Sequence, residues 1–376
     1  MKGDGIYITK MEAIYTDKYE ISQNHPYQSY VNHMPDLYLN IKETATATGN
    51  FAAELFDSKT IKELREISKK PGKNGFFVGA GAAQWAGSSR GTDRFPYKEQ
   101  QGKTPFLTVI NIAAGKLANM LGYADYIATD ATACISGVKA MHDAMIMIKL
   151  GYIDRAIVFG WDDQINNATL EVFGVTKASL TKEDIESGKK PSAFDDKNGG
   201  FLIGHGFGYV LLENKKSIKK TKNKPIAEIK SIFVGAEYVG NPLTLTSNGY
   251  INAMKNAIKE SGVKKSKISF IKAHGSGTVR NNEEESKAIK AVFNDKIPVT
   301  SYKPEIGHTM GPSGLIEMII ALEDLKKGFI RPIKNKTRDE SQFLSKKMKA
   351  KNVKYFLCNS SGMGNVFASC VIKKIK

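Results

Sequence analysis

The sequence predicts an α/β protein made of two similar halves, and three observations lead to that prediction. Short β-branched or aromatic runs alternate with apolar or amphipathic stretches of helical length. The alternation occurs twice, once before and once after a lysine-rich segment at 214–225. The chain has 376 residues, which is more than one core usually fills. We therefore expect one half over 1–214 and the other over 225–376.

The first half contains four expected strands and three expected helices. The strands are short runs rich in β-branched or aromatic residues; they cover 5–15, 75–80, 125–129 and 155–160. The helices are apolar throughout or have apolar residues at helical spacing; they cover 50–70, 105–121 and 136–150. The last helix ends at Gly151, a residue type common at helix C-termini. Because this helix separates two strands, those strands should run parallel.

The second half repeats the pattern after the charged segment, which we interpret as a linker between the halves. Its expected strands cover 226–235, 268–273, 297–301, 353–358 and 366–374. Its expected helices cover 248–261, 282–292 and 313–327. Strands that alternate with buried helices in both halves indicate an α/β architecture with parallel strand pairs.

The charge is unusual, because 55 Lys and Arg against 38 Asp and Glu give a net charge of +17. Lysines cluster at 214–224 and 346–354, but neither cluster is interleaved with aromatic residues or accompanied by a nucleic-acid-binding motif. We therefore expect no nucleic-acid partner. An acidic protein partner and a simply solvated basic surface both remain open.

The composition also bounds where the protein acts. No run reaches the roughly 20 apolar residues that a membrane-spanning helix needs, and the first residues lack the apolar stretch of a secretory signal. Three cysteines are too few for a disulfide framework and fit a reducing compartment. We expect a cytoplasmic protein without a membrane span.

Cys134 is the candidate nucleophile. It stands in the segment ATACISG between an expected strand and an expected helix. The start of a helix favours a thiolate, and backbone N–H groups there can hold an oxyanion. A buried structural cysteine is the alternative at this point. Cys358 and Cys370 lie in strand patterns, and we expect both to be structural.

Two of the six histidines stand in loops that follow expected strands. His274 opens HGSGT, and His308 lies in GHTMGPSG. Functional groups of α/β folds collect beyond such strand ends. The two histidines could be metal ligands, although a metal site would usually add a third close ligand, which is not evident. A neutral imidazole pair is also what is needed to hold a thioester oxygen and stabilise an enolate. Three further histidines are expected on the surface or in a packing role: His25, His33 and His142. The sequence leaves open whether His205 is structural or adds to the site.

Five ordered blocks between about 130 and 365 resemble one family, the β-ketoacyl-acyl carrier protein synthases. These are decarboxylating condensing enzymes of the thiolase fold. The first 100 residues match only loosely. The blocks are DATACISGVKAM, SAFDDKNGGFLIGHGFGYVLLE, KAHGSGTVRNNEEE, SYKPEIGHTMGPSGLIEM and CNSSGMGN.

The resemblance implies a thiolase-like fold, with layers in the order α-β-α-β-α and mixed central sheets. It implies that Cys134 accepts the acyl chain. It implies that His274 and His308 promote decarboxylation of a malonyl thioester and stabilise the enolate. The backbone N–H groups of Cys134 and Met363 match the oxyanion hole. Cys-His-His is the pattern of the elongating members.

Four further residues match supporting positions of the family. Lys303 matches a lysine that orders the site, and Glu285 matches its acidic partner. Ser276 and Thr278 match two hydroxyl residues that bind the phosphopantetheine arm.

The resemblance further implies an acyl carrier protein as partner, whose acidic surface would suit the basic chain. It implies a homodimer, or a heterodimer with a related ketosynthase-like subunit. No metal or redox cofactor is expected, because the substrates are carried on phosphopantetheine.

Several block positions depart from the family pattern, and two of them concern the gate of the acyl tunnel. Met363 and Ser361 stand where the family has phenylalanines. A methionine is thinner and more flexible than phenylalanine, which suggests unusual chain selection. The other altered positions are His205, Asn198, Gly199 and Asn282.

Three alternatives remain beside a β-ketoacyl synthase of fatty acid, polyketide or polyene synthesis. A chain-length-factor-like partner subunit would usually lack the nucleophile, which is present here. A thiolase or an acyltransferase of the same fold would not condense by decarboxylation. An RNA-binding module would rest on charge alone and leaves the five blocks unexplained.

Overall fold

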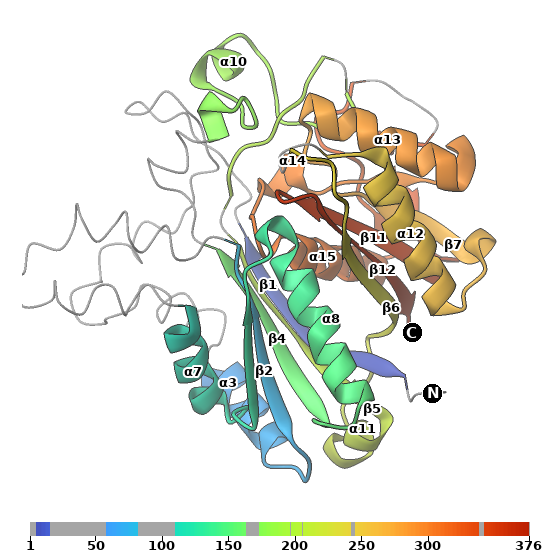
Figure 1. Ribbon diagram of the computed structural model, residues 1–376. Helices are drawn as coiled ribbons and strands as arrows, with labels where there is room; N and C mark the ends of the chain where they lie inside the picture. Colours follow the sequence, from blue (N-terminus) through green and yellow to red (C-terminus); the bar gives the residue numbers. More distant parts are fainter. Residues whose placement is uncertain are drawn as a thin grey trace, which may run out of the picture.

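The described strands form one large mixed sheet and one small one (Figure 1). The computed structural model describes residues 5–15, 58–81, 110–162, 173–195, 197–204, 206–241, 245–337 and 342–375. The large sheet has ten strands in the order β3-β2-β4-β5-β1-β6-β12-β11-β7-β8, and β9 pairs with β10.

The elements alternate along the chain as the sequence predicts. The strands are β1 Ile6–Tyr15, β2 Asn74–Gly79, β3 Tyr126–Asp130, β4 Arg155–Asp162, β5 Gly206–Asn214, β6 Ala227–Ala236, β7 Ile268–Lys272, β8 Val299–Thr300, β9 Phe329–Ile330, β10 Met348–Lys349, β11 Tyr355–Gly362 and β12 Val366–Lys374. The α-helices are α3 Ser58–Ser68, α7 Ile110–Leu121, α8 Ser136–Lys149, α10 Lys182–Glu186, α11 Lys215–Thr221, α12 Ser247–Ser261, α13 Val279–Phe293, α14 Lys303–Ile306 and α15 Ser313–Lys327. A 3₁₀ turn, η1 Ala133–Ile135, precedes α8.

The sheet consists of two five-stranded sets with the same topology. Read outward from the centre, the first set is β1-β5-β4-β2-β3 and the second is β6-β12-β11-β7-β8. In each set the inner pairs are antiparallel and the outer pairs are parallel. The sets join where residues 6–8 of β1 pair with residues 227–229 of β6.

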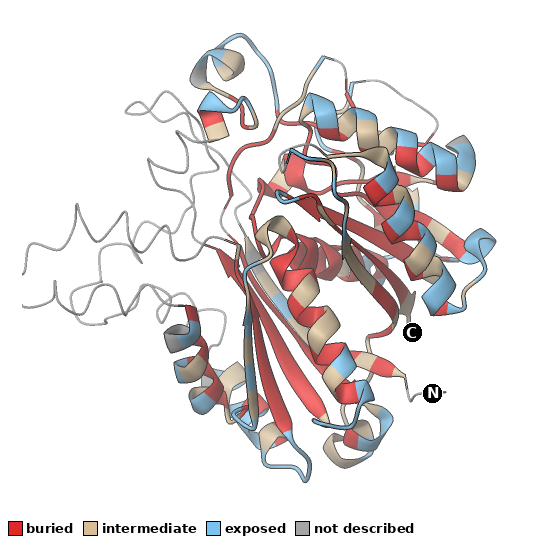
Figure 2. Cartoon of the chain, viewed as in Figure 1, coloured by how far each residue is buried: buried red, intermediate tan, exposed pale blue. Residues whose placement is uncertain are grey.

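Two helices lie at the centre of the molecule, because α8 and α15 each contact strands of both sets and also contact each other. Buried residues of α8, α15 and both strand sets form one continuous core. A second core packs α3 and α7 on the first set, and a third packs α12 and α13 on the second. The layers are therefore α-β-α-β-α, and strands such as β2, β4, β5 and β11 are almost wholly buried, whereas the edge strand β3 is not (Figure 2). This confirms the expected thiolase-like α/β architecture.

One prediction needs correction, the parallel direction of the strands around the first central helix is confirmed, and some predicted helical residues remain untested. The segment at 214–225 is not an open linker: it contains α11, capped by Asn214, and the buried carboxylate of Glu213 accepts hydrogen bonds from Ser217 and Thr221. The strands β3 and β4 are both parallel to β2, which lies between them. The predicted helical residues 50–57 and 105–109 lie outside the described residues.

The topology brings several strand ends together. The chain leaves β3 into η1 and α8, and it leaves β8 through α14 into α15. Both central helices begin with Ser-Gly, at 136–137 and 313–314. The amide of Gly137 donates to the carbonyl of Gly311, so the two helix starts lie side by side. The candidate site lies at this junction. Among the described residues, no helix is long and apolar enough to cross a membrane.

Candidate active site

Cys134 lies in a tight turn between β3 and α8. Its neighbour Ala133 has φ +44°, in the left-handed region that costs free energy for any residue with a Cβ. The turn is closely packed: a Cβ on Gly79 would lie 2.4 Å from the carbonyl oxygen of Ser136. A strained conformation held by such packing fixes the position of the thiol.

The thiol of Cys134 is half-buried against Phe201, Ile203 and Met310. Burial raises the pKa of this thiol to about 12, although the charge of Lys303 acts in the opposite direction. The expected thiolate is therefore wrong for the resting site, because loss of hydration outweighs the favourable start of the helix. Cys134 is a neutral thiol until a substrate arrives.

The two predicted histidines meet at the same junction. His274 follows β7 and His308 follows α14; both are buried, and their ring centroids are 5.6 Å apart. The backbone of His308 is held by the first half, since its N–H donates to the carbonyl of Leu202 at 2.7 Å. The ring of Phe201, which packs against Cys134, stands edge-on to His308 at 5.0 Å. The structure thus brings Cys134, His274 and His308 into one cluster.

Backbone amides fix which ring nitrogen carries the proton. The N–H of Ser361 donates to Nδ1 of His274 at 3.3 Å, and the N–H of Met310 donates to Nδ1 of His308 at 3.1 Å. A backbone amide can only donate, so each Nδ1 is an acceptor and each neutral ring carries its hydrogen on Nε2. Burial, together with the charge of Lys303, holds the pKa of both histidines well below the usual value. The site therefore contains two neutral N–H donors.

The acidic partner predicted for Lys303 is wrong. Lys303 pairs with Glu317 at 2.5 Å and donates to the carbonyl of His274 at 2.7 Å. Glu317 also pairs with Lys272 at 3.1 Å, and all three side chains are buried. Glu317 is the acceptor because α15 carries it between the two lysines, whereas α13 holds Glu285 on the other side of the His274 backbone.

Glu285 supports the loop of His274 instead. Its two oxygens accept the backbone N–H groups of His274 and Gly275, each at 2.8 Å. The side-chain amides of Asn281 and Asn359 also donate to it, each at 3.3 Å. Burial raises the pKa of this carboxyl, and the amide hydrogen bonds act in the opposite direction.

The end of β11 lies directly beside Cys134. A Cβ on Gly362 would be 3.0 Å from the backbone nitrogen of Cys134, so the amides of Cys134 and Met363 lie on adjoining turns. The side chain of Met363 is 48% exposed. The other predicted gate residue, Ser361, is fully buried and hydrogen-bonded to Tyr250 at 2.5 Å. Its position is a support of His274 and not a gate.

The predicted phosphopantetheine-binding pair lies next to His274. Ser276 and Thr278 are 3.2 Å apart between their hydroxyl oxygens, and the glycine between them has φ +87°. The carbonyl of Gly277 accepts the N–H of Gly200 at 2.7 Å. Of the altered block residues, Asn282 donates from its side-chain amide to the carbonyl of Gly277 at 3.3 Å and accepts the N–H of Phe194. Asn198 instead accepts the N–H of Lys190.

Sequence reasoning missed three polar residues of the site. Asp162 ends β4 and accepts the amides of Gly81 and Gly311, which ties both halves together at the junction. Glu317 could have been found, because a glutamate with apolar residues on both sides, in LIEMII, needs a buried partner. Tyr250 gives no such signal, since a tyrosine in an amphipathic helix is unremarkable.

The other candidate residues lie away from the cluster or outside the described residues. His142 contacts Asp143 on α8, and the cysteines Cys358 and Cys370 are buried opposite each other on β11 and β12. The described residues contain no group of three or more His, Cys, Asp or Glu arranged to hold a metal ion. Three of the six histidines lie outside the described part of the chain: His25, His33 and His205.

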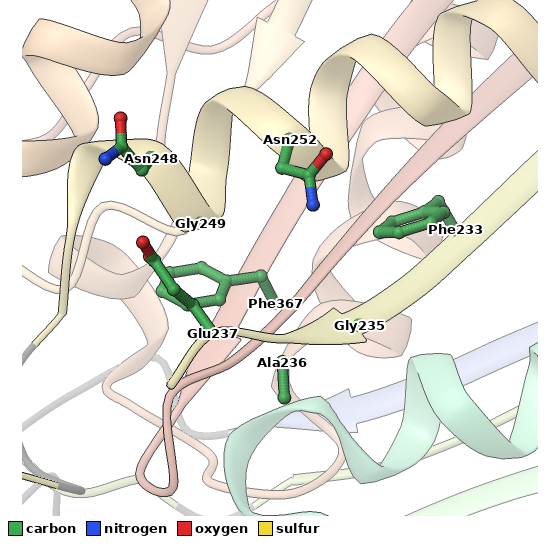
Figure 3. A pocket seen from close by; sticks show the side chains of 8 residues that line it. All are labelled: Phe233, Gly235, Ala236, Glu237, Asn248, Gly249, Asn252 and Phe367. Atoms are coloured by element: carbon green, nitrogen blue, oxygen red, sulfur yellow. The ribbon is translucent and has the colours of Figure 1, made fainter. Parts of the chain in front are cut away.

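A surface cavity of about 200 Å³ lies apart from the cluster, between the ends of β6 and β12 and the start of α12 (Figure 3). Its lining includes Phe233, Glu237, Asn248 and Phe367, and none of the candidate site residues.

Family models cover most of the chain. The model described as Beta-ketoacyl synthase, N-terminal domain, matches residues 47–217. The model described as Beta-ketoacyl synthase, C-terminal domain, matches residues 226–337. The two matches lie on either side of the segment after α11.

Individual proteins that are similar to this chain carry related names. A putative mitochondrial 3-oxoacyl-[acyl-carrier-protein] synthase of Schizosaccharomyces pombe is 29% identical over 280 residues, which are 71% of this chain and 66% of that protein. The chain thus spans slightly less than two thirds of this relative. A beta-ketoacyl synthase from Burkholderia phymatum superposes with a TM-score of 0.82 at 18% identity, covering 99% of this chain and 100% of that one. The ishigamide ketosynthase/chain length factor gives a TM-score of 0.80 at 17% identity, with full coverage of both chains.

Proposed function

The chain belongs to the β-ketoacyl synthase family, and from this premise we propose that it condenses an acyl group with a malonyl unit in fatty acid or polyketide synthesis. The single observation that carries the proposal is the pair of neutral imidazoles, both with hydrogen on Nε2, clustered with Cys134. Donors of this kind serve an oxygen that becomes negative during reaction.

The first step is acyl transfer to Cys134. The sulfur attacks the carbonyl carbon of an acyl thioester, the thioester bond to the carrier breaks, and the proton of Cys134 ends on the departing carrier thiol. The raised thiol pKa means that this proton leaves only as the new bond forms. In this proposal the amides of Cys134 and Met363 hold the oxyanion of the tetrahedral intermediate, which the closeness of Gly362 to the Cys134 amide supports.

The second step is decarboxylative condensation. A malonyl thioester loses CO2, and its electron pair moves onto the thioester oxygen as an enolate. The Nε2–H groups of His274 and His308 donate to that oxygen and spread its charge. The enolate carbon then attacks the acyl carbonyl, and Cys134 leaves as a thiolate that regains a proton. Cys134, His274 and His308 thus act as the Cys-His-His set of an elongating enzyme.

The remaining residues have supporting roles in this proposal. Lys303 holds the His274 backbone, and Glu317 keeps that lysine in place. Ser276 and Thr278 bind the phosphopantetheine arm, and Met363 lines the acyl tunnel. The two steps need no metal or redox cofactor. The cysteines are free thiols, which suits a reducing cytoplasmic compartment.

The partner is an acyl carrier protein, as the name of the fission-yeast relative indicates for that protein. A net charge of +17 favours an acidic carrier. The protein also acts as a dimer, either with itself or with a related ketosynthase-like subunit of the kind named in the ishigamide structure.

The test follows the intact mass of the purified protein. A short acyl thioester of an acyl carrier protein is added first, and malonyl-carrier protein second, with Cys134→Ala as the control. We expect a mass increase that depends on Cys134 and that disappears as a β-ketoacyl carrier product forms. Acylation without discharge would instead indicate a transacylase. No acylation with any donor would indicate a chain-length-factor-like partner subunit.

A further inference from the structure

A closed ring of hydrogen bonds begins and ends at His274. Nδ1 of His274 accepts the N–H of Ser361 at 3.3 Å, and the Ser361 hydroxyl lies 2.5 Å from the Tyr250 hydroxyl. Tyr250 donates to the Asn281 side chain at 2.6 Å, and Asn281 donates to Glu285 at 3.3 Å. Glu285 accepts the backbone N–H of His274 at 2.8 Å. The ring therefore holds both the side chain and the backbone of this histidine.

The direction of each bond follows from what each group can donate. The Glu285 carboxylate accepts, so Asn281 presents its NH₂ to Glu285 and its carbonyl oxygen to Tyr250. The Tyr250 hydroxyl has one hydrogen, which it donates to that oxygen. The Ser361 hydroxyl is therefore the donor to Tyr250. All members of the ring are buried. Burial also raises the pKa of Tyr250 well above its usual value, so its hydroxyl keeps the hydrogen.

Close packing of α12 on β12 lets Tyr250 reach the ring. Gly249 precedes it, and a Cβ at that position would lie 2.2 Å from a ring atom of Phe367. Phe367 lies beneath the start of α12, beside Gly249 (Figure 3). The Tyr250 ring stands edge-on to the ring of Phe367 at 5.0 Å. Tyr250 is fully buried.

Tyr250 adds a second link between the two elements that hold His274, beside the hydrogen bond from Asn359 to Glu285. Ser361 belongs to β11, and Asn281 and Glu285 belong to α13. The family block has phenylalanine where this chain has Ser361. A phenylalanine ring there would collide with the Tyr250 hydroxyl, which is 2.5 Å from Ser361 Oγ. This chain has a hydrogen-bonded tyrosine–serine pair at that place.

We infer that Tyr250 is a positioning residue for His274 in the decarboxylation step, acting through Ser361 and Asn281. The inference rests on the proposed function. Tyr250 touches no substrate; it keeps β11 and α13 in register, so that the Ser361 amide holds Nδ1 as acceptor and Nε2–H stays aimed at the thioester oxygen. Misplacing a catalytic group by a fraction of an ångström is costly to rate.

The test compares two half-reactions in Tyr250→Phe, which keeps the ring and removes the hydroxyl. We expect decarboxylation of malonyl-carrier protein to fall about tenfold to a hundredfold. Acyl loading of Cys134 should change less than about twofold, because loading does not use His274. Tyr123→Phe is the matched control, since it removes another fully buried tyrosine hydroxyl, in the first half of the chain. It should alter neither half-reaction.

Two further measurements separate positioning from a general loss of structure. In a His274→Asn background, Tyr250→Phe should have no additional effect on decarboxylation, because the group it positions is absent. The ¹⁵N shifts of the His274 ring should report hydrogen on Nε2 in the wild type and a mixture of tautomers in Tyr250→Phe. Equal losses in both half-reactions, or an unchanged His274 ring signal, would overturn the inference. If the wild type does not decarboxylate malonyl-carrier protein, the proposed function fails, and the ring shifts still decide the role of Tyr250.

Discussion

The turn that carries Cys134 and the turn that carries His308 occupy equivalent places in the two halves. Each follows the outermost strand of its set, β3 or β8, and each leads into a central helix that begins with Ser-Gly. The two turns meet at the hydrogen bond between Gly137 and Gly311. One scaffold is therefore used twice, and its two copies supply different chemistry to one place.

The difference between the copies is the polarity of their buried faces. The buried residues of α8 are small or apolar, whereas α15 buries Glu317 and Asp324. Glu317 binds two buried lysines that stand behind His274. The first copy thus fixes a neutral thiol in a strained turn. The second copy uses buried charge to fix two neutral imidazoles. The comparison teaches that close packing positions the candidate nucleophile, whereas buried ion pairs and hydrogen bonds position the backbone of the candidate donor His274.

The largest expected effect comes from removing the chemistry of the first copy. Cys134→Ala should reduce acyl loading by at least about a thousandfold, because no other described thiol is placed to accept the chain. The free energy of unfolding should stay nearly unchanged, since the thiol has no structural partner beyond apolar contacts. Loading that persists in this variant would break the assignment of the nucleophile to the first half.

Removing one of the two histidine rings should slow decarboxylation much more than acyl loading. His274→Ala and His308→Ala should each lower decarboxylation by about a hundredfold to a thousandfold, the range for loss of one oxyanion donor. Acyl loading should fall much less. Parallel single-turnover measurements of loading and decarboxylation test this. An equal loss in both steps would mean that the halves do not divide the reaction as proposed.

The electrostatic framework of the second copy predicts an effect on stability. Glu317→Gln leaves Lys272 and Lys303 buried without a countercharge and should lower the free energy of unfolding by about 3–5 kcal/mol. Lys272→Met leaves Lys303 paired with Glu317. It should therefore lower the free energy of unfolding clearly less than Glu317→Gln does. Urea denaturation of both variants measures the difference. A similar decrease in the free energy of unfolding in the two variants would show that the balance of buried charges does not stabilise this half.

The buried histidines predict a pH dependence. Their pKa values are lowered in the folded protein, so the unfolded chain binds more protons below its own pKa of about 6.5. Stability from these groups is complete above that pH and is lost as the pH falls below it, by up to about 1.4 kcal/mol per pH unit for each histidine. Denaturation at pH 7.5 and 5.5 should show a smaller loss in His308→Gln than in the wild type. The same slope in both would contradict the neutral pair.

The smallest effect is expected at the edge of the site. Met363→Phe should change the relative rates of acyl loading for short and long chains by a few fold, because a rigid ring replaces a flexible side chain that is 48% exposed. Acyl carrier thioesters of several lengths, compared with wild type, measure this profile. Identical profiles would mean that Met363 has no part in chain selection.

The sequence predicted most of the fold because its elements have strong local signals. The run YIAT predicts a strand, and the apolar stretch after Cys134 predicts a helix. Both predictions depend only on residues that are close in sequence. Even there, the order of the strands was not readable, since β2 enters between β3 and β4 through contacts distant in sequence. The lysine-rich segment does connect the two strand sets, but its short helix was not predicted, because the hydrogen bonds to the buried Glu213 that hold it are not visible in the sequence.

By itself the sequence determined the α/β class, the repeated alternation of elements, and the choice of Cys134, His274 and His308 as the candidate chemical groups. Only the tertiary structure decided which carboxylate pairs with Lys303, which ring nitrogen of each histidine carries hydrogen, and that the thiol is neutral. Each of these depends on desolvation and on partners from other elements. Three elements that are distant in sequence, α15, β11 and α12, bring Glu317, Ser361 and Tyr250 to the site. No local sequence pattern predicts these contacts.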